Sequence, residues 1–335
     1  MKPIPDELRS GPFTRQAAKS AGVSSRMLQG KRFVRIFPGV WRCADHAMTE
    51  ADWVRAATLA LPDDAYLTGI TLIQQLGCDF GPKRPMRFVV ERDHHLKFDE
   101  IFLHRTEELP PTDGRCVSVA AAFIAYCATA RVVDAIKVGD WLLRNRHTTI
   151  SEIRDVALSG LWRAGAHEAV WVLDHLDPRS RSLKESETRS VLEFAGLPVP
   201  ESNVTLPIGD DVVVVGDLVY KRWKTVVEYE GSQHQESRDQ YVYDIDRYAI
   251  YRAHGIRYVQ ATKEKLDHAR TLVGEVYREL LRAGYDGPPP EFGERWKLLF
   301  RQCSVAVGPR KDRVRAGAER KRVASRGPKS RAAVS

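Results

Sequence analysis

The sequence predicts an α+β protein built from several domains, and three observations lead to this class. Residues 14–42 show two short helical patterns followed by two short strand patterns. Residues 212–229 contain two strands rich in valine and tyrosine, with helical patterns before and after them. Residues 309–335 are rich in basic and small side chains and lack the large apolar residues that build a core. We therefore expect helices and strands in separate domains, followed by a disordered basic tail.

A length of 335 residues gives room for two or three domains with a sizeable core. In chain order we expect a winged helix-turn-helix at 1–45, a helical and mixed α/β connecting domain at 46–178, an α/β/α core domain at 179–285, a helical extension at 286–308 and the tail at 309–335. Residues 178–182, Pro-Arg-Ser-Arg-Ser, have the composition of a linker and are expected to join the two halves.

The N-terminal elements follow from capping and turn residues. Thr14 is expected to cap the first helix, and Gly22 to allow the tight turn after it. Ser24 is expected to cap a second helix, with Met27 and Leu28 facing inward. A proline–glycine pair further on favours a turn between two short strands, the wing of the motif. Other helix–glycine–helix segments share this pattern, so it leaves a purely structural interpretation open.

In a helix-turn-helix the second helix enters the major groove of DNA with its N-terminal residues leading. The side chains expected to contact bases or phosphates are Ser25, Arg26 and Gln29, and those expected to contact phosphates are Lys31, Arg32 and Arg35. Basic side chains bind the phosphates of any DNA sequence. The segment therefore predicts DNA as a partner but no particular recognition sequence.

Acidic residues lie in the two apolar strands of the second half. Asp217 is in the first strand, Glu228 and Glu230 are in the second, and His234 follows in the turn beyond. Because side chains alternate across a strand, Glu228 and Glu230 point to the same face. If Asp217 lies on that face, three carboxylates converge and offer hard oxygen ligands to Mg²⁺ or Mn²⁺. The alternative is a solvated acidic edge, and spacing alone does not decide between the two.

Residues 186–266 extend this pattern in both directions. A helix with Glu187 precedes the strands, and a closing strand reads IRYVQAT. Between them lies a helix with Arg238, Asp244 and Arg247, of which the last two have the spacing of an ion pair. In this order the elements resemble the PD-(D/E)XK nuclease-like domain of a widespread bacterial family related to the very-short-patch-repair endonucleases. The resemblance implies a restriction-endonuclease-like α/β/α core.

The same resemblance implies metal-dependent hydrolysis of phosphodiester bonds in DNA. The catalytic residues it implies are Glu187, Asp217, Glu228, Glu230 and His234, with Mg²⁺ or Mn²⁺ held by Asp217 and Glu228. One departure matters, because the superfamily pattern has a lysine where this chain has Glu230. His234 or Glu187 would therefore have to act as the base or orient the attacking water.

A second resemblance covers the N-terminal segment FTRQAAKSAGVSSRMLQGKRFVRIFPGVWR, residues 13–42. It is similar to the N-terminal winged helix of AbiEi-type antitoxins of abortive-infection systems. In actinobacterial members this segment frequently precedes the nuclease-like domain described above. Together the two resemblances imply a DNA-binding protein of phage defence or of a toxin–antitoxin system.

The charge is concentrated at one end of the chain. The formal net charge is +8, and residues 309–335, with ten Lys or Arg and two Asp or Glu, account for all of it. A polybasic tail binds nucleic acid by releasing counterions, although it can also be a solubilising extension. The five cysteines are scattered without a CxxC pair, which favours neither a disulfide framework nor a zinc site.

The sequence contains no long apolar run and no pattern of a signal peptide. We therefore expect a cytoplasmic protein with DNA and no membrane as partner, and its oligomeric state stays open between monomer and homodimer. The leading hypothesis is a DNA-binding protein with a metal-dependent endonuclease-like domain. The alternative is a non-catalytic DNA-binding regulator of the antitoxin or repressor type. A third hypothesis is an interaction scaffold whose modules only hold partners.

Overall fold

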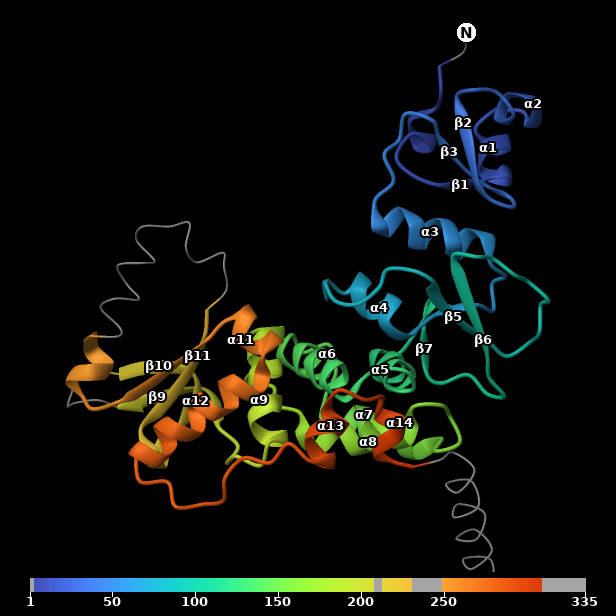
Figure 1. Ribbon diagram of the computed structural model, residues 1–335. Coiled ribbons are helices and arrows are strands. Elements are labelled where there is room, and N and C mark those ends of the chain that lie inside the picture. Colours follow the sequence, from blue (N-terminus) through green and yellow to red (C-terminus); the bar gives the residue numbers. More distant parts are fainter. Residues whose placement is uncertain (1–2, 208–212, 231–248, 309–335) are drawn as a thin grey trace, which may run out of the picture. The chain divides into compact units, whose positions relative to one another are not determined.

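The computed structural model describes residues 3–207, 213–230 and 249–308. The chain divides into two compact units, Met1–Ala125 and Tyr126–Ser335. Both units combine helices with strands, and the described strands form three sheets (Figure 1). This mixture confirms the predicted α+β class.

The first unit begins with a helix–hairpin segment, which we define as residues 3–45. In chain order it contains η1 (Asp6–Leu8), β1 (Phe13–Thr14), α1 (Arg15–Ser20), α2 (Ser25–Leu28), β2 (Phe33–Phe37) and β3 (Val40–Cys43). The three strands pair antiparallel in the order β1-β3-β2. Its small core consists of Ile4, Leu8, Phe13, Ala18, Val23, Leu28, Phe33 and Cys43.

The predicted caps and turn of this segment are confirmed. Thr14 Oγ1 accepts a backbone N–H of the first turn of α1 at 3.1 Å, and Ser24 Oγ does the same for α2 at 3.3 Å. Gly22 has a φ of 78°, which favours a residue without a side chain. Leu28 is buried as predicted, but Met27 is 36% exposed, so its predicted inward orientation is wrong. The short helix α2 therefore buries Leu28 and leaves Met27 toward solvent.

The rest of the first unit surrounds a five-stranded sheet with the order β6-β5-β4-β8-β7. Its elements are α3 (Glu50–Ala60), β4 (Tyr66–Leu67), α4 (Gly69–Gln75), β5 (Met86–Val90), β6 (Ile101–Arg105), β7 (Thr112–Asp113) and β8 (Cys116–Val117). Helix α3 begins with a capping box in which Thr49 and Asp52 satisfy each other's backbone N–H groups. The apolar helix α5 (Val119–Cys127) contains the boundary between the units.

The second unit combines a helical part with a four-stranded sheet. The helical part contains α6 (Val132–Arg144), α7 (Ile150–Ser159), α8 (Ala166–Val172), η2 (Leu173–His175), α13 (Glu294–Leu299) and α14 (Cys303–Ala306). The sheet and its helices are α9 (Leu183–Phe194), β9 (Glu201–Pro207), β10 (Val213–Tyr220), η3 (Lys221–Trp223), β11 (Thr225–Tyr229), β12 (Arg257–Ala261), α11 (Lys263–Asp267) and α12 (Ala269–Arg282).

The sheet has the order β12-β11-β10-β9, with β11 and β12 parallel and the other neighbours antiparallel. Helices α9 and α12 pack against it (Figure 1). A further apolar cluster joins the strands to residues 249–256 and contains Leu206, Val219, Val226, Tyr251 and Ile256. The predicted strands around Asp217 and Glu228 are therefore confirmed as neighbours in one sheet.

Residues 178–182, predicted to be a linker between the two halves, instead lie within the second unit, where Ser180 anchors them. The side chain of Ser180 is 3% exposed, and its hydroxyl lies 2.8 Å from that of Ser186 in α9. Just before this stretch, the backbone N–H of Asp177 donates to Asp140 in α6 at 2.7 Å. The prediction was wrong because composition alone does not show contacts with residues distant in the sequence.

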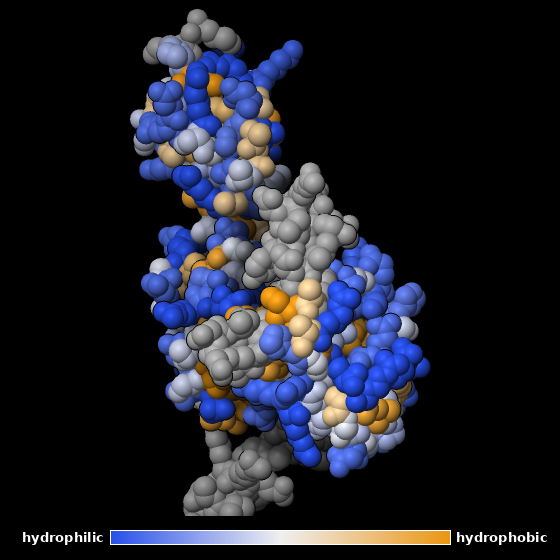
Figure 2. Space-filling model, turned by 90° about the vertical axis from the view of Figure 1, so that its left-hand side faces the viewer, coloured by the Kyte–Doolittle hydropathy of each residue, from blue (hydrophilic) through white to orange (hydrophobic). Residues whose placement is uncertain are grey.

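Hydrophilic residues predominate on the face of the molecule in Figure 2, with hydrophobic residues scattered between them. In the part of the chain that the structure describes, no helix combines the length and the apolar character needed to cross a bilayer.

Candidate functional site

The site begins where strands β10 and β11 part. Their ladder ends at Leu218 and Val227. One residue beyond it, Asp217 Oδ2 accepts the backbone N–H of Tyr229 at 3.0 Å, so a side chain takes the place of a ladder carbonyl. At the preceding Gly216, a Cβ atom would lie 2.7 and 2.8 Å from methyl carbons of two core valines. Tight backbone packing and a hydrogen bond therefore fix Asp217 in position.

Helix α9 brings a second carboxylate, Glu185, toward Asp217. Glu185 is 7% exposed, and it accepts hydrogen bonds from Asn203 Nδ2 at 2.6 Å and from the N–H of Arg181 at 2.8 Å. Burial and the negative charge of Asp217 raise the pKa of Glu185. Our sequence analysis missed Glu185. The signal was present, because Ser182 and Glu185 have the Ser-x-x-Glu spacing of a helix start, and Ser182 caps α9.

Glu187, the helix acid implied by the resemblance, lies between two lysines. Its Oε2 is 3.1 Å from Lys137 Nζ in α6 and 2.9 Å from Lys184 Nζ. Burial alone would raise the pKa of Glu187, but the two ammonium groups hold it below its ordinary value. Within α9, the lysines thus surround Glu187, whereas the charge of Asp217 acts on Glu185.

Glu228 and Glu230 lie on one face of the sheet, as alternation predicts. Glu228 is 2% exposed and accepts a hydrogen bond from the hydroxyl of Tyr251 at 2.8 Å. Glu230 accepts one from the hydroxyl of Tyr258 at 2.8 Å and another from the amide of Gln260. The rings of Tyr251 and Tyr258 stack with centroids 5.9 Å apart, which places the two carboxylates side by side. Each acid thus accepts a hydrogen bond from at least one neutral donor of the protein itself.

Carboxylate oxygens are the ligands that Mg²⁺ and Mn²⁺ prefer, so the donor chemistry of Glu185, Asp217 and Glu228 suits such a cation. The number of ligands does not fit, because within residues 3–207, 213–230 and 249–308 no three His, Cys, Asp or Glu side chains form a metal-binding group. Four residues of the sequence predictions lie outside the described residues, namely His234, Arg238, Asp244 and Arg247.

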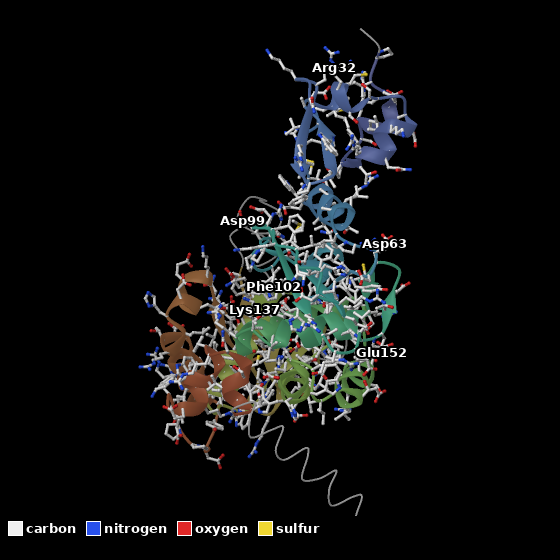
Figure 3. The ribbon with its side chains drawn as sticks, turned by 90° about the vertical axis from the view of Figure 1, so that its right-hand side faces the viewer. Arg32, Asp63, Asp99, Phe102, Lys137 and Glu152 are labelled. Atoms are coloured by element: carbon white, nitrogen blue, oxygen red, sulfur yellow. The ribbon has the colours of Figure 1, made fainter. Side chains whose placement is uncertain are left out.

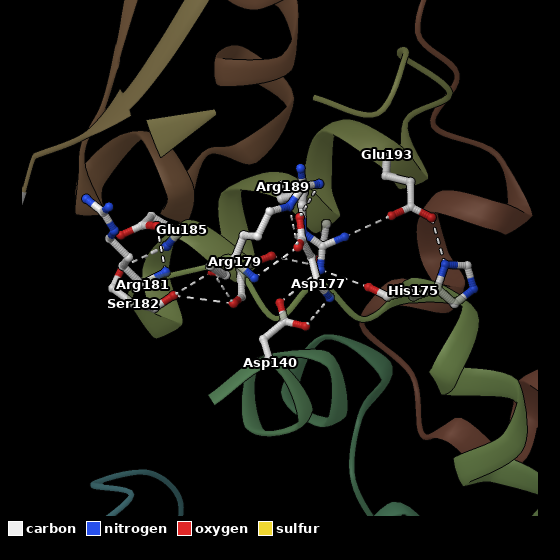
Figure 4. A network of polar contacts seen from close by, with 12 residues as sticks. Asp140, His175, Asp177, Arg179, Arg181, Ser182, Glu185, Arg189 and Glu193 are labelled. Carbon is white, nitrogen blue, oxygen red and sulfur yellow. Dashed lines mark hydrogen bonds and ion pairs between the residues drawn. The ribbon is translucent and has the colours of Figure 1, made fainter. Parts of the chain in front are cut away.

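A network of buried charges holds α9 against α6 and η2 (Figure 4). Arg189 Nη2 donates to Asp140 Oδ2 at 2.9 Å and to the carbonyl of His175 at 2.8 Å. Glu193 Oε1 lies 2.7 Å from His175 Nδ1. Burial raises the pKa of Asp140 to about 6, although Arg189 opposes this shift. The network links α6, η2 and α9, and it therefore fixes the helix that carries Glu185.

The side chains predicted to contact DNA lie on the surface of the helix–hairpin segment. The exposed ones are Ser25, Arg26, Gln29, Lys31 and Arg35. Arg32 is half-buried just before β2 (Figure 3). Arg15 donates to Ser25 Oγ at 2.8 Å, and Arg35 stacks over Trp41 with its guanidinium carbon 5.9 Å from the ring centroid. Arg15, which the sequence analysis did not single out, thus adds a basic group beside the start of α2.

Comparison of this chain with protein-family models, with curated proteins and with solved structures finds no match.

Proposed function

We propose that this chain binds DNA through an N-terminal winged helix-turn-helix and hydrolyses phosphodiester bonds at the end of the β10–β11 ladder, in a restriction-endonuclease-like domain. The observation that carries the proposal is the link between Glu185 on a helix and Asp217 on a strand. Asn203, whose neighbours in β9 pair with the residues on either side of Asp217, donates to Glu185 at 2.6 Å, and the charge of Asp217 raises the pKa of Glu185. When two carboxylates lie close together, their repulsion raises the pKa of one of them, and such shifted groups are typical of sites that transfer protons. The order of elements in residues 186–266 also supports the proposal through its resemblance to a nuclease-like domain.

The residues of this chain have distinct parts in the proposal. Asp217 stays in place through its bond to the N–H of Tyr229. Glu185 has a raised pKa, which moves it toward the range in which a carboxyl group exchanges protons with water and leaving groups. A divalent cation, when bound, would neutralise charge on the phosphate. The described ligands alone do not complete a site for that cation.

The test is a cleavage assay on plasmid and single-stranded DNA with Mg²⁺ or Mn²⁺. Asp217→Asn is expected to abolish cleavage. Glu185→Gln and Glu187→Gln form a matched pair on one helix, and we expect only the first to remove activity. Glu294→Gln, which alters an exposed ion pair with Lys297 at 2.8 Å, is the control and should cut like the wild type. No cleavage by the wild type, or equal cleavage by Asp217→Asn, refutes the proposal.

A non-catalytic DNA-binding regulator is the second candidate function. It is favoured by the way in which Glu228 and Glu230 accept hydrogen bonds from Tyr251, Tyr258 and Gln260, since carboxylates satisfied by the protein need no cation. This candidate predicts binding to DNA upstream of the protein's own gene without cleavage. Footprinting on that DNA is the test, and protection no different from that of unrelated DNA argues against it.

A further inference from the structure

One end of the sheet in the second unit is strongly basic. It is formed by residues 220–224, 252–257 and 278–286, which together contain seven Lys or Arg and two Asp or Glu. We call this surface the basic end. It lies at the start of β11 and β12, whereas Glu228 and Glu230 lie toward the other end of β11.

The three segments are joined by direct contacts. The backbone N–H of Arg257 donates to the carbonyl of Lys224 at 2.8 Å. The guanidinium of Arg257 donates to the carbonyl of Arg282 at 2.8 Å. The rings of Trp223 and Tyr285 meet edge to face with centroids 5.2 Å apart. The basic side chains therefore belong to one continuous surface.

Part of this positive charge has no carboxylate partner among the residues that the structure describes. Lys221 pairs with Glu201, and Arg257 and Arg282 share Glu279. Among the described contacts of the second unit, Arg222, Lys224 and Arg278, three exposed residues of this surface, have no carboxylate partner. Like charges held together without compensation destabilise a fold, so such a cluster is typical of a surface that receives a polyanion.

Lys224 supplies a second, independent observation. It follows η3 with a φ of 44° and a ψ of 44°, in the left-handed region that favours Gly or Asn. A lysine at this position is unfavourable for the local backbone, yet Lys224 is exposed, as is Arg222 two positions before it. The guanidinium of Arg222 in turn stacks over Trp223, 5.3 Å from the ring centroid, which orients it. The turn thus has a basic residue at a backbone position that would be more stable with Gly or Asn.

From these contacts we infer that the basic end is a second nucleic-acid-binding surface, which holds the phosphodiester backbone of DNA independently of the helix–hairpin segment. An anionic membrane fits less well, because a membrane-binding helix turns its apolar face outward. Helix α12 instead buries that face through Leu272, Val273, Val276 and Leu280. The inference takes from the proposed function only that DNA is the ligand, and it requires no cleavage.

The test measures binding of the full chain to a labelled duplex by fluorescence anisotropy at several KCl concentrations. The double variant Arg222→Gln/Lys224→Asn removes two phosphate contacts, so the slope of log K against log[KCl] should become shallower by about 1.8. At about 0.1 M KCl the affinity should fall on the order of 60-fold. Lys297→Gln, in an exposed ion pair on α13, is the matched control and should leave the slope unchanged.

A stability measurement separates loss of the surface from loss of the fold. Lys224→Asn alone places a residue that tolerates the left-handed region, so its melting temperature should equal or exceed that of the wild type while its affinity falls. A lower melting temperature together with unchanged affinity overturns the inference.

Three further outcomes of these binding experiments would overturn the inference. If Arg222→Gln/Lys224→Asn binds like the wild type while Arg26→Gln/Lys31→Gln binds more weakly, the inference fails and the proposed DNA binding stands. If the wild type binds no duplex, both fail. Binding to vesicles with phosphatidylserine that the double variant loses, without binding to the duplex, assigns the surface to a membrane and overturns the inference.

Discussion

Replacing Arg189 by methionine should strongly destabilise the second unit, because this guanidinium compensates buried carboxylates. Its side chain is 3% exposed, and that of its partner Asp140 is 1% exposed. Arg189 also lies 3.5 Å from Glu193 and donates to the carbonyl of His175 at 2.8 Å. Methionine keeps much of the volume and removes every one of these polar contacts.

The size of the loss can be worked out from the contacts. Without Arg189, Asp140 can take up a proton instead of staying charged and buried. Because the pKa of Asp140 is already about 6 with Arg189 present, protonation at about pH 7 costs at most about 1.4 kcal/mol, which limits the contribution of Asp140 to the loss. The carbonyl of His175 loses a buried donor, which costs about 1–3 kcal/mol. We therefore expect the free energy of unfolding to fall by about 3–4 kcal/mol, in line with the removal of one partner from a buried ion pair. The loss should be smaller at low pH, where Asp140 is protonated.

Urea denaturation followed by tryptophan fluorescence measures this loss. Arg179→Met is the matched control, because Arg179 is 52% exposed and its ion pair with Asp177 should contribute at most about 1 kcal/mol. The reasoning is refuted if Arg189→Met costs no more than Arg179→Met, or if its cost is the same at about pH 5 and about pH 8.

Three further predictions concern pH, packing and hydrogen bonding. The folded pKa of Asp140, about 6, lies above its ordinary 3.8, so its contribution to stability is full below the lower value and lost as the pH rises through the upper. Unfolding free energies should fall by about 3 kcal/mol over that window, and Asp140→Asn should flatten the profile. Gly216→Ala should cost about 1–3 kcal/mol because its Cβ meets core methyls, whereas Gly274→Ala, with open space in α12, should stabilise by about 0.5–1 kcal/mol in thermal melts. Tyr251→Phe removes a hydroxyl donor from the buried Glu228 and should cost about 1–3 kcal/mol, and an unchanged melting temperature would contradict that hydrogen bond.

The features that the sequence predicted correctly depend on residues close together in the chain. Thr14 and Ser24 cap their helices because a cap needs only a side-chain oxygen and an N–H three residues on. Glu228 and Glu230 share a face because alternation along a strand is a local rule. The prediction that Met27 faces inward was wrong, because helical spacing does not show which side of a short helix packs against the rest of the protein.

Residues 178–182 show that composition does not reveal contacts between residues distant in the sequence. Their serine and arginine content is that of a linker, but Ser180 is buried against α9. Just before them, Asp177 bonds to Asp140, which lies 37 positions earlier in the sequence. No local pattern contains such a contact, so composition gave the opposite answer.

The sequence by itself predicted helix α9, the strands β10, β11 and β12, and the acids in two of those strands. Only the tertiary structure decided which acid of α9 faces Asp217. Each helical residue turns the side-chain direction by about 100°, so Glu185 and Glu187 point to different sides of the same helix. Lys137 in the neighbouring α6 takes one of them, and Asp217 in the sheet faces the other. That choice depends on how helix and sheet pack, which no spacing within α9 contains.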